Sequence, residues 1–155
     1  MYIMIILVIY ESRRGRARDA ADAIGDVAAS SGVATLITSI DDDVMPNVVA
    51  SADAVVAGCS TSGKVPFGDE PTQRLVDWVQ GLPSLEGKPV GVFCTYKFFP
   101  NTFADMAART GEIESAISRA FELKGGKAVA SQSINFKSIE EGATTLVDKV
   151  LEHLH

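Results

Sequence analysis

The feature that most constrains the fold is a continuous apolar run near the start of the chain, Ile3–Tyr10, which is rich in β-branched side chains. A strand has this pattern when both of its faces are covered, as in the middle of a parallel sheet. Ala54–Ala57 is a second very apolar run. Further strands are predicted at Val33–Ser39, Pro89–Cys94 and Lys127–Phe136. The sequence therefore predicts five strands.

Helical segments separate these strands. The longer ones place apolar residues on one face at helical spacing, and the predicted segments are Ala17–Ser30, a short turn over Met45–Ala50, Pro71–Gln80, Glu112–Lys124 and a last helix carrying the stripe Leu146, Val147, Val150, Leu151 and Leu154. Gly32 is predicted to end the first helix. The pattern Ser138-Ile139-Glu140-Glu141 predicts a capping box at the start of the last one.

Alternation of strands and helices indicates parallel pairing through right-handed crossovers. We expect one α/β domain over residues 1–155, with a doubly wound five-stranded parallel sheet in three α/β/α layers. Strand order 2-1-3-4-5 is favoured because it centres the first and third strands, the two most apolar. Ligands bind such sheets beyond the carboxyl ends of the strands, at the switch point between strands one and three. Three loops therefore form the predicted site.

Composition limits the function classes. The net charge of -6 argues against nucleic-acid binding, which needs a basic face. The apolar start has no basic residues before it and is shorter than the roughly 20 residues of a membrane-spanning helix, so neither a signal peptide nor a membrane anchor is expected. Cys59 and Cys94 are too few for a disulfide scaffold. We therefore expect a cytoplasmic protein.

The first loop, Ser12–Ala17, joins the first strand to the first helix. Gly15 permits a tight approach to the amides at the helix start, which attract anions. Four arginines, Arg13, Arg14, Arg16 and Arg18, gather there in an acidic chain. Because cations at a helix N-terminus oppose its dipole, they do not serve helix stability. An anion site, with phosphate as the natural ligand, is favoured over a solvated basic turn.

The other two loops suit a flat ligand. Gly58–Gly68 is rich in glycine and small hydroxyl residues, which let backbone atoms reach the edge of a ring; the alternative is a merely flexible connection. Thr95–Phe103 concentrates aromatic residues, which stack on rings. An equally weighted alternative is that Phe98, Phe99 and Phe103 pack a short helical excursion or form a dimer contact.

Together these loops resemble those of the flavodoxins, and the resemblance spans nearly the whole chain. Ser12 and Gly15 match the family pattern Ser/Thr-x-Thr-Gly-Asn-Thr, whereas Arg14 and Ala17 replace its two later hydroxyl residues and Arg16 replaces Asn. In the second loop Gly58 and Thr61 match Gly-x-Pro-Thr-Tyr-x-Gly, and Ser62 stands at the Tyr position. Thr95-Tyr96 resembles the position of a ring packed against the flavin.

The resemblance implies that the chain binds flavin mononucleotide (FMN) and serves electron transfer or a small flavin-dependent reduction. A redox partner protein or a small-molecule acceptor is implied, with a monomer or homodimer as the assembly. No side chain is expected to be catalytic, because the flavin performs the redox chemistry. The implied FMN-binding residues are Ser12, Arg13, Arg14, Gly15, Arg16, Ala17, Ser60, Thr61, Ser62, Gly63, Thr95, Tyr96, Lys97 and Phe98.

The departures in the first two loops motivate an alternative function, in which the fold is kept without flavin and the arginine-rich loop senses an anion or binds a protein. Other chemistry is less favoured. The chain lacks the acceptor Asp of a receiver domain, the loop cysteine of a small tyrosine phosphatase and a Walker loop. Cys59 and Cys94 are expected to be buried hydrophobes rather than a redox pair. No metal is expected at Asp41–Asp43, His153 or His155.

Overall fold

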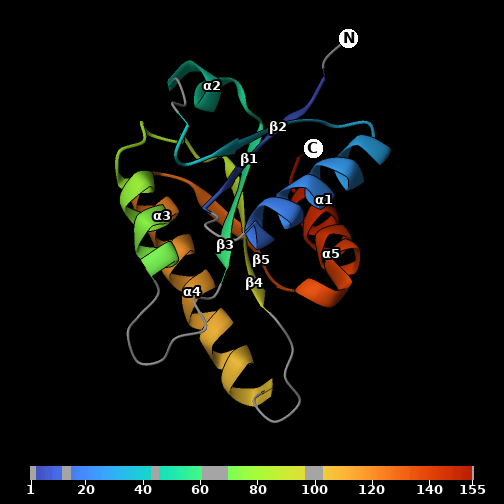
Figure 1. Ribbon diagram of the computed structural model, residues 1–155. Coiled ribbons are helices and arrows are strands. Elements are labelled where there is room, and N and C mark those ends of the chain that lie inside the picture. Colours follow the sequence, from blue (N-terminus) through green and yellow to red (C-terminus); the bar gives the residue numbers. More distant parts are fainter. Residues whose placement is uncertain (1–2, 12–14, 43–45, 61–69, 97–102, 155) are drawn as a thin grey trace.

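Five parallel strands form one sheet in the order β2-β1-β3-β4-β5, which confirms the predicted order (Figure 1). The computed structural model describes residues 3–11, 15–42, 46–60, 70–96 and 103–154. The strands are β1 (Ile5–Tyr10), β2 (Ala34–Ser39), β3 (Ala54–Ser60), β4 (Pro89–Tyr96) and β5 (Lys127–Asn135). As expected from its more polar sequence, β2 lies at an edge.

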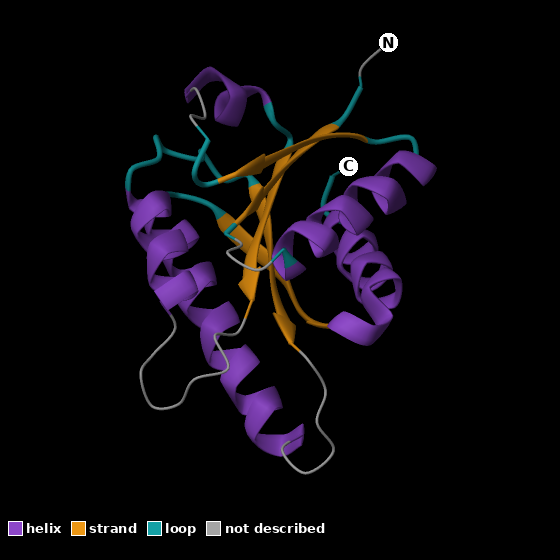
Figure 2. Cartoon of the chain, in the orientation of Figure 1, coloured by secondary structure: helices purple, strands orange, loops and turns teal. Residues whose placement is uncertain are grey.

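Helices cover both faces of the sheet, as the three-layer prediction requires (Figure 2). They are α1 (Arg16–Ser30), α2 (Pro46–Ser51), α3 (Glu70–Gln80), α4 (Phe103–Leu123) and α5 (Ile139–Leu151), with a short 3₁₀ turn η2 (Phe136–Ser138) before α5. Helices α1 and α5 pack together on one face, and α3 and α4 on the other (Figure 1). In the part of the chain so described, no helix is both long and apolar enough to cross a membrane.

The two faces have separate cores because successive side chains of a strand point in opposite directions. In β1, Leu7 and Ile9 belong to the core under α3 and α4, whereas Ile6 and Val8 belong to the core under α1 and α5. All four side chains are fully buried. The continuous apolar run that predicted a central strand is therefore explained by two covered faces.

Helix α4 differs most from its prediction. It begins at Phe103, nine residues before the predicted start at Glu112, so Phe103 belongs to this helix rather than to a loop. The added residues include good helix formers such as Ala104, Met106 and Ala107, and a single Gly111 inside a helix costs only about 1 kcal/mol. The N-terminal part of α4 consequently projects beyond the carboxyl ends of the strands (Figure 1).

Strands β3 and β4 also run further than predicted, to Ser60 and Tyr96. The parallel ladder between them continues to the pair Ser60 and Thr95, so the first residues of both predicted loops are paired strand residues. Hydroxyl residues and glycine weakened the strand signal, but the ladder decides the local structure. Conversely, β5 ends one residue early, because Phe136 begins η2.

The helix ends were partly predicted. Gly32 follows α1 with a positive φ of 77°, and the amide of Val33 donates to the Ala28 carbonyl, so the predicted stop is confirmed. Ser138 does stand at the N-cap of α5, but its side chain makes no capping hydrogen bond, so the predicted capping box is wrong. The chain enters α5 from η2 rather than from an extended strand, and the Asn135 side chain caps η2 instead. The buried stripe of α5 is confirmed at Leu146, Val147 and Val150.

Gly58 offers a test of the packing at the switch point. A Cβ atom there would lie 2.4 Å from the Phe93 ring, which is itself fully buried. We expect Gly58→Ala to lower the free energy of unfolding by about 1–3 kcal/mol, because an overpacked core must shift its neighbours. Urea denaturation measures this change.

Gly111→Ala is the matched control. A Cβ atom at this position meets nothing within 4 Å, so the substitution should stabilise α4 by about 0.5–1 kcal/mol. Equal effects of the two substitutions would contradict the packing described at Gly58.

Candidate functional site

The carboxyl ends of β1, β3 and β4 lie at one edge of the sheet, next to the start of α1. Of the fourteen residues predicted to bind FMN, the described part of the chain contains Gly15, Arg16, Ala17, Ser60, Thr95 and Tyr96. All six belong to this edge, because they stand at the start of α1 or at the ends of β3 and β4. The other predicted residues, Ser12, Arg13, Arg14, Thr61, Ser62, Gly63, Lys97 and Phe98, lie outside the described residues.

The start of α1 is formed by a glycine in the left-handed conformation. Gly15 is the N-cap residue, with φ of 84°, and a Cβ atom there would meet nothing within 4 Å. A glycine has no side chain to accept a hydrogen bond from the first helical amides. Its carbonyl accepts the amide of Asp19 at 3.0 Å, which closes the first turn. The site therefore combines helix amides with the close approach that a glycine allows.

Arg16 and Ala17 follow Gly15 but point to different surroundings. The Arg16 guanidinium lies over the Phe136 ring, 5.4 Å from its centroid, which links α1 to the turn after β5. The Ala17 side chain is fully buried in the core under α1 and α5. Ala17 can therefore contribute only backbone atoms to a ligand, whereas Arg16 places a cation beside the helix start.

A pair of hydroxyl groups closes the ends of β3 and β4. Ser60 Oγ and Thr95 Oγ1 are 2.6 Å apart, and Thr95 is fully buried. Tyr96 follows as the last residue of β4, half-buried and paired with Asn135 of β5. The second and third predicted loops thus begin side by side, at a polar contact rather than an apolar one.

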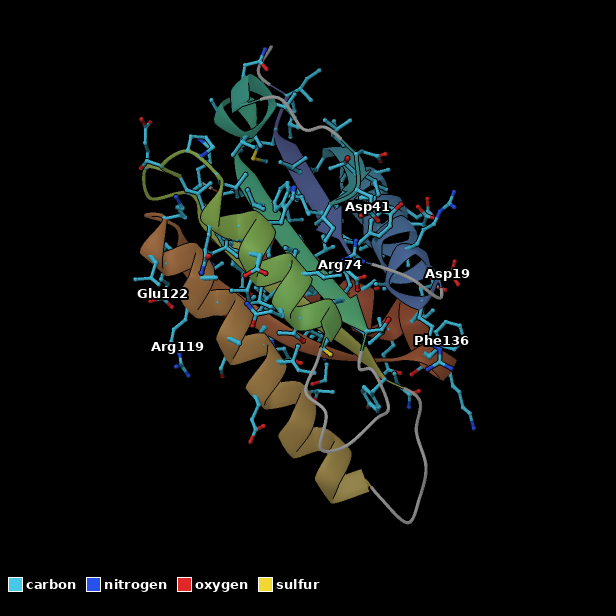
Figure 3. All side chains as sticks on the ribbon, turned by 60° about the vertical axis from the view of Figure 1, so that its left-hand side comes forward. Asp19, Asp41, Arg74, Arg119, Glu122 and Phe136 are labelled. Carbon is cyan, nitrogen blue, oxygen red and sulfur yellow. The ribbon has the colours of Figure 1, made fainter. Side chains whose placement is uncertain are left out.

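A charged cluster that was not predicted from the sequence lies at the same edge. Glu11, the residue after β1, is only 1% exposed, and its Oε1 lies 2.5 Å from Nη1 of Arg74 on α3. The other terminal nitrogen of Arg74 lies 2.5 Å from Oδ1 of Asp41, which follows β2. Figure 3 labels Arg74 and Asp41 in this cluster. The sequence signal was an acidic residue directly after a buried strand.

A second buried carboxylate lies between α4 and β5. Glu114 is 6% exposed, and its Oε2 is 2.6 Å from Ser133 Oγ, which is also 2.9 Å from Thr110 Oγ1. Burial raises the pKa of Glu114 above its ordinary value, against smaller lowering effects from the Ser133 hydrogen bond and the charge of Lys149. This carboxyl group is therefore held in an environment that favours its neutral form.

The cysteine and histidine residues considered as candidate site residues have surroundings typical of structural residues. Cys59 and Cys94 are register partners on neighbouring strands, and both are buried thiols within the core under α3 and α4. This supports their interpretation as small hydrophobes. His153 is exposed after α5, with Nδ1 3.0 Å from the Lys149 carbonyl. Among the residues whose placement is given, no three His, Cys, Asp or Glu side chains form a group that could hold a metal ion.

Comparison with known proteins identifies relatives over most of the chain. The sequence profile of the family described as Flavodoxin matches residues 8–132. Oxidised flavodoxin 1 from Bacillus cereus has a TM-score of 0.69 at 16% identity, covering 97% of this chain and 99% of that chain. The flavodoxin of Streptococcus pneumoniae TIGR4 has a TM-score of 0.64 at 17% identity, with 96% and 99% covered. Two-electron reduced Megasphaera elsdenii flavodoxin has a TM-score of 0.63 at 19% identity, covering 92% of this chain and 98% of that chain.

Glu114 gives a pH-dependent test of the second cluster. Because its pKa is raised in the folded protein, its contribution to stability is complete below the ordinary carboxyl pKa of about 4.3 and is lost as pH rises through the folded value. Glu114→Gln has no such loss. The stability of this variant relative to the wild type should therefore increase between pH 4 and pH 8, as measured by urea denaturation. Glu122→Gln, exposed on the same helix, is the control; parallel pH profiles for wild type and Glu114→Gln would contradict this assignment.

Proposed function

The chain belongs to the flavodoxin family, whose members bind FMN, and we propose that it binds FMN at the carboxyl edge of its sheet and transfers electrons. The observation that carries the proposal is the meeting of three chain segments at this edge. The open glycine start of α1 stands beside the ends of β3 and β4, at the switch point where doubly wound sheets bind ligands.

The start of α1 fits the phosphate of FMN. The amides after Gly15 supply donors, and the positive end of the helix dipole favours an anion. A cation at the first helical position is unfavourable by itself, because Arg16 faces that same positive end. A bound phosphate would interact favourably with both the positive end of the helix and the Arg16 guanidinium. The contact of Arg16 with Phe136 holds this side chain nearby. Ser12, Arg13 and Arg14 stay sequence-based predictions for the same role.

The ends of β3 and β4 fit the ring system. Ser60 and Thr95 are paired in the ladder and also share a hydroxyl contact, so the chain leaves β3 and β4 at one place. Tyr96 stands at the end of this pair with an aromatic side chain suited to cover a ring. The residues that follow these strand ends in the sequence stay predictions for the same site; they are Thr61, Ser62, Gly63, Lys97 and Phe98.

Bound FMN would supply the redox chemistry, by accepting and releasing electrons. The residues of the chain bind the phosphate, orient the ring and limit its contact with water, and none is assigned as an acid or base. We propose an electron carrier acting with a redox partner protein, or a reductase acting on a small molecule. The electron carrier and the reductase would use the same edge of the sheet. They differ in the electron acceptor, which is a protein for the carrier and a small molecule for the reductase.

The visible spectrum of the purified protein tests this function directly. Absorption bands of bound flavin, or quenching of FMN fluorescence when apoprotein is titrated, are the expected results. A colourless protein that leaves FMN fluorescence unchanged would contradict FMN binding and would favour a flavin-free anion-binding or protein-binding role.

Arg16→Ala tests the phosphate assignment. Loss of a charged hydrogen-bond donor is expected to weaken FMN binding by about 1.5–3 kcal/mol, while riboflavin, which lacks the phosphate, should lose much less. Fluorescence titrations with both flavins measure the difference. Lys137→Ala removes an equal charge from the neighbouring turn and should leave both affinities nearly unchanged. An equal loss for the two flavins would argue against a phosphate contact.

A further inference from the structure

Glu11 occupies a place where the fold calls for an apolar residue. It continues the alternation of Leu7 and Ile9, whose side chains lie in the core under α3 and α4, and it is nearly as buried as they are. Its own amide donates to the Gly58 carbonyl at 3.1 Å, which fixes the end of β1 against β3. A buried carboxylate is unfavourable unless it is paired, so this charge depends on its partner.

Arg74 pairs with Glu11, and it also pairs with Asp41 in the segment after β2. Its Nη1 contacts Glu11 and its Nη2 contacts Asp41, so the planar guanidinium is oriented at both ends. The Arg74 side chain is 29% exposed and Asp41 is 62% exposed, so the cluster runs from the protein interior to the surface. Arg74 thereby ties α3 to the chain segments that leave β1 and β2.

Glu11 links the ion pairs of Arg74 to the proposed phosphate site, because it lies close in sequence to the start of α1. Only residues 12–14 separate it from Gly15, the N-cap of α1. Because one residue spans at most about 3.3–3.6 Å, the short separation limits how far Gly15 can lie from Glu11. The place of Glu11 therefore constrains the place of Gly15 at the start of α1.

We propose that Arg74 is a positioning residue that holds Glu11 at the end of β1, and through it the start of α1 at Gly15, in the arrangement required to bind the FMN phosphate. An ion pair suits this task better than an apolar contact. Apolar replacement of a buried ion pair often preserves or increases stability, but it lacks the directed hydrogen bonds that fix one geometry. The affinity part of this inference rests on the proposed FMN binding; the effect of Arg74 on the end of β1 and the start of α1 in the unliganded protein does not.

Arg74→Gln tests the affinity part. We expect the Kd for FMN to rise by about tenfold, because displacement of a positioned group weakens binding without removing a ligand contact. The Kd for riboflavin should change little, since riboflavin lacks the phosphate that the start of α1 is proposed to bind. Arg119→Ala removes the same charge from the outer side of α4, away from Arg74, and should change neither value (Figure 3). An unchanged FMN affinity, or an equal loss for both flavins, would overturn the proposal.

The double substitution Glu11→Leu with Arg74→Met separates positioning from stability. This variant replaces the ion pair between Glu11 and Arg74 with an apolar contact. We expect its thermal unfolding midpoint to stay near that of the wild type while its FMN affinity stays reduced. Recovery of both properties would show that the pair serves only stability. Loss of stability in Arg74→Gln alone does not affect this comparison.

Hydrogen exchange of the apoprotein tests the inference without a flavin. The reporters are the amides of Glu11 and Ile40, which donate to Gly58 and Tyr10, and the amide of Asp19, which donates to Gly15. Arg74→Gln should speed their exchange by several fold relative to the amide of Leu85, which donates to Lys124 away from the cluster. Unchanged exchange at all three reporters would overturn the positioning role. A wild type that binds neither flavin would instead overturn the proposed function.

Discussion

The parallel ladder of β1, β3 and β4 is the constraint on which the rest of the structure depends. Its side chains are buried on both faces, so the strands must be largely apolar and must be covered by helices on both sides. Parallel pairing also brings all carboxyl ends to one edge. Polar residues can therefore gather there without entering the core, and the same packing that stabilises the sheet gathers the proposed site.

Polar contacts at this edge take over where apolar packing ends. The hydroxyl pair of Ser60 and Thr95 joins β3 to β4, and the ion pairs of Arg74 join the ends of β1 and β2 to α3. Each contact is directional, whereas the core beneath is held by contacts without preferred direction. The edge is thus fixed by a few specific interactions, and substitutions there are expected to alter ligand geometry more than overall folding.

The strand order was predictable because hydrophobic pattern and connection rules act locally along the sequence. The apolar sequence of β1 predicted a central strand, and the more polar sequence of β2 predicted an edge strand. Gly32 predicted the end of α1. The pairing of Arg74 with Glu11 was not predictable, since 63 positions separate them and either charge alone is typical of a solvated surface. The early start of α4 was also missed, because helix propensity is weak evidence without a cap or an apolar face.

The central claim is that FMN binds at the carboxyl edge, between the start of α1 and the ends of β3 and β4. Amide chemical shifts of the labelled protein, recorded by NMR during titration with FMN, test it most directly. We expect the largest shifts at Gly15, Arg16, Ala17, Ser60, Thr95 and Tyr96, with small shifts at the amino ends of the strands. Shifts concentrated at those amino ends or on the outer faces of α4 and α5 would contradict it.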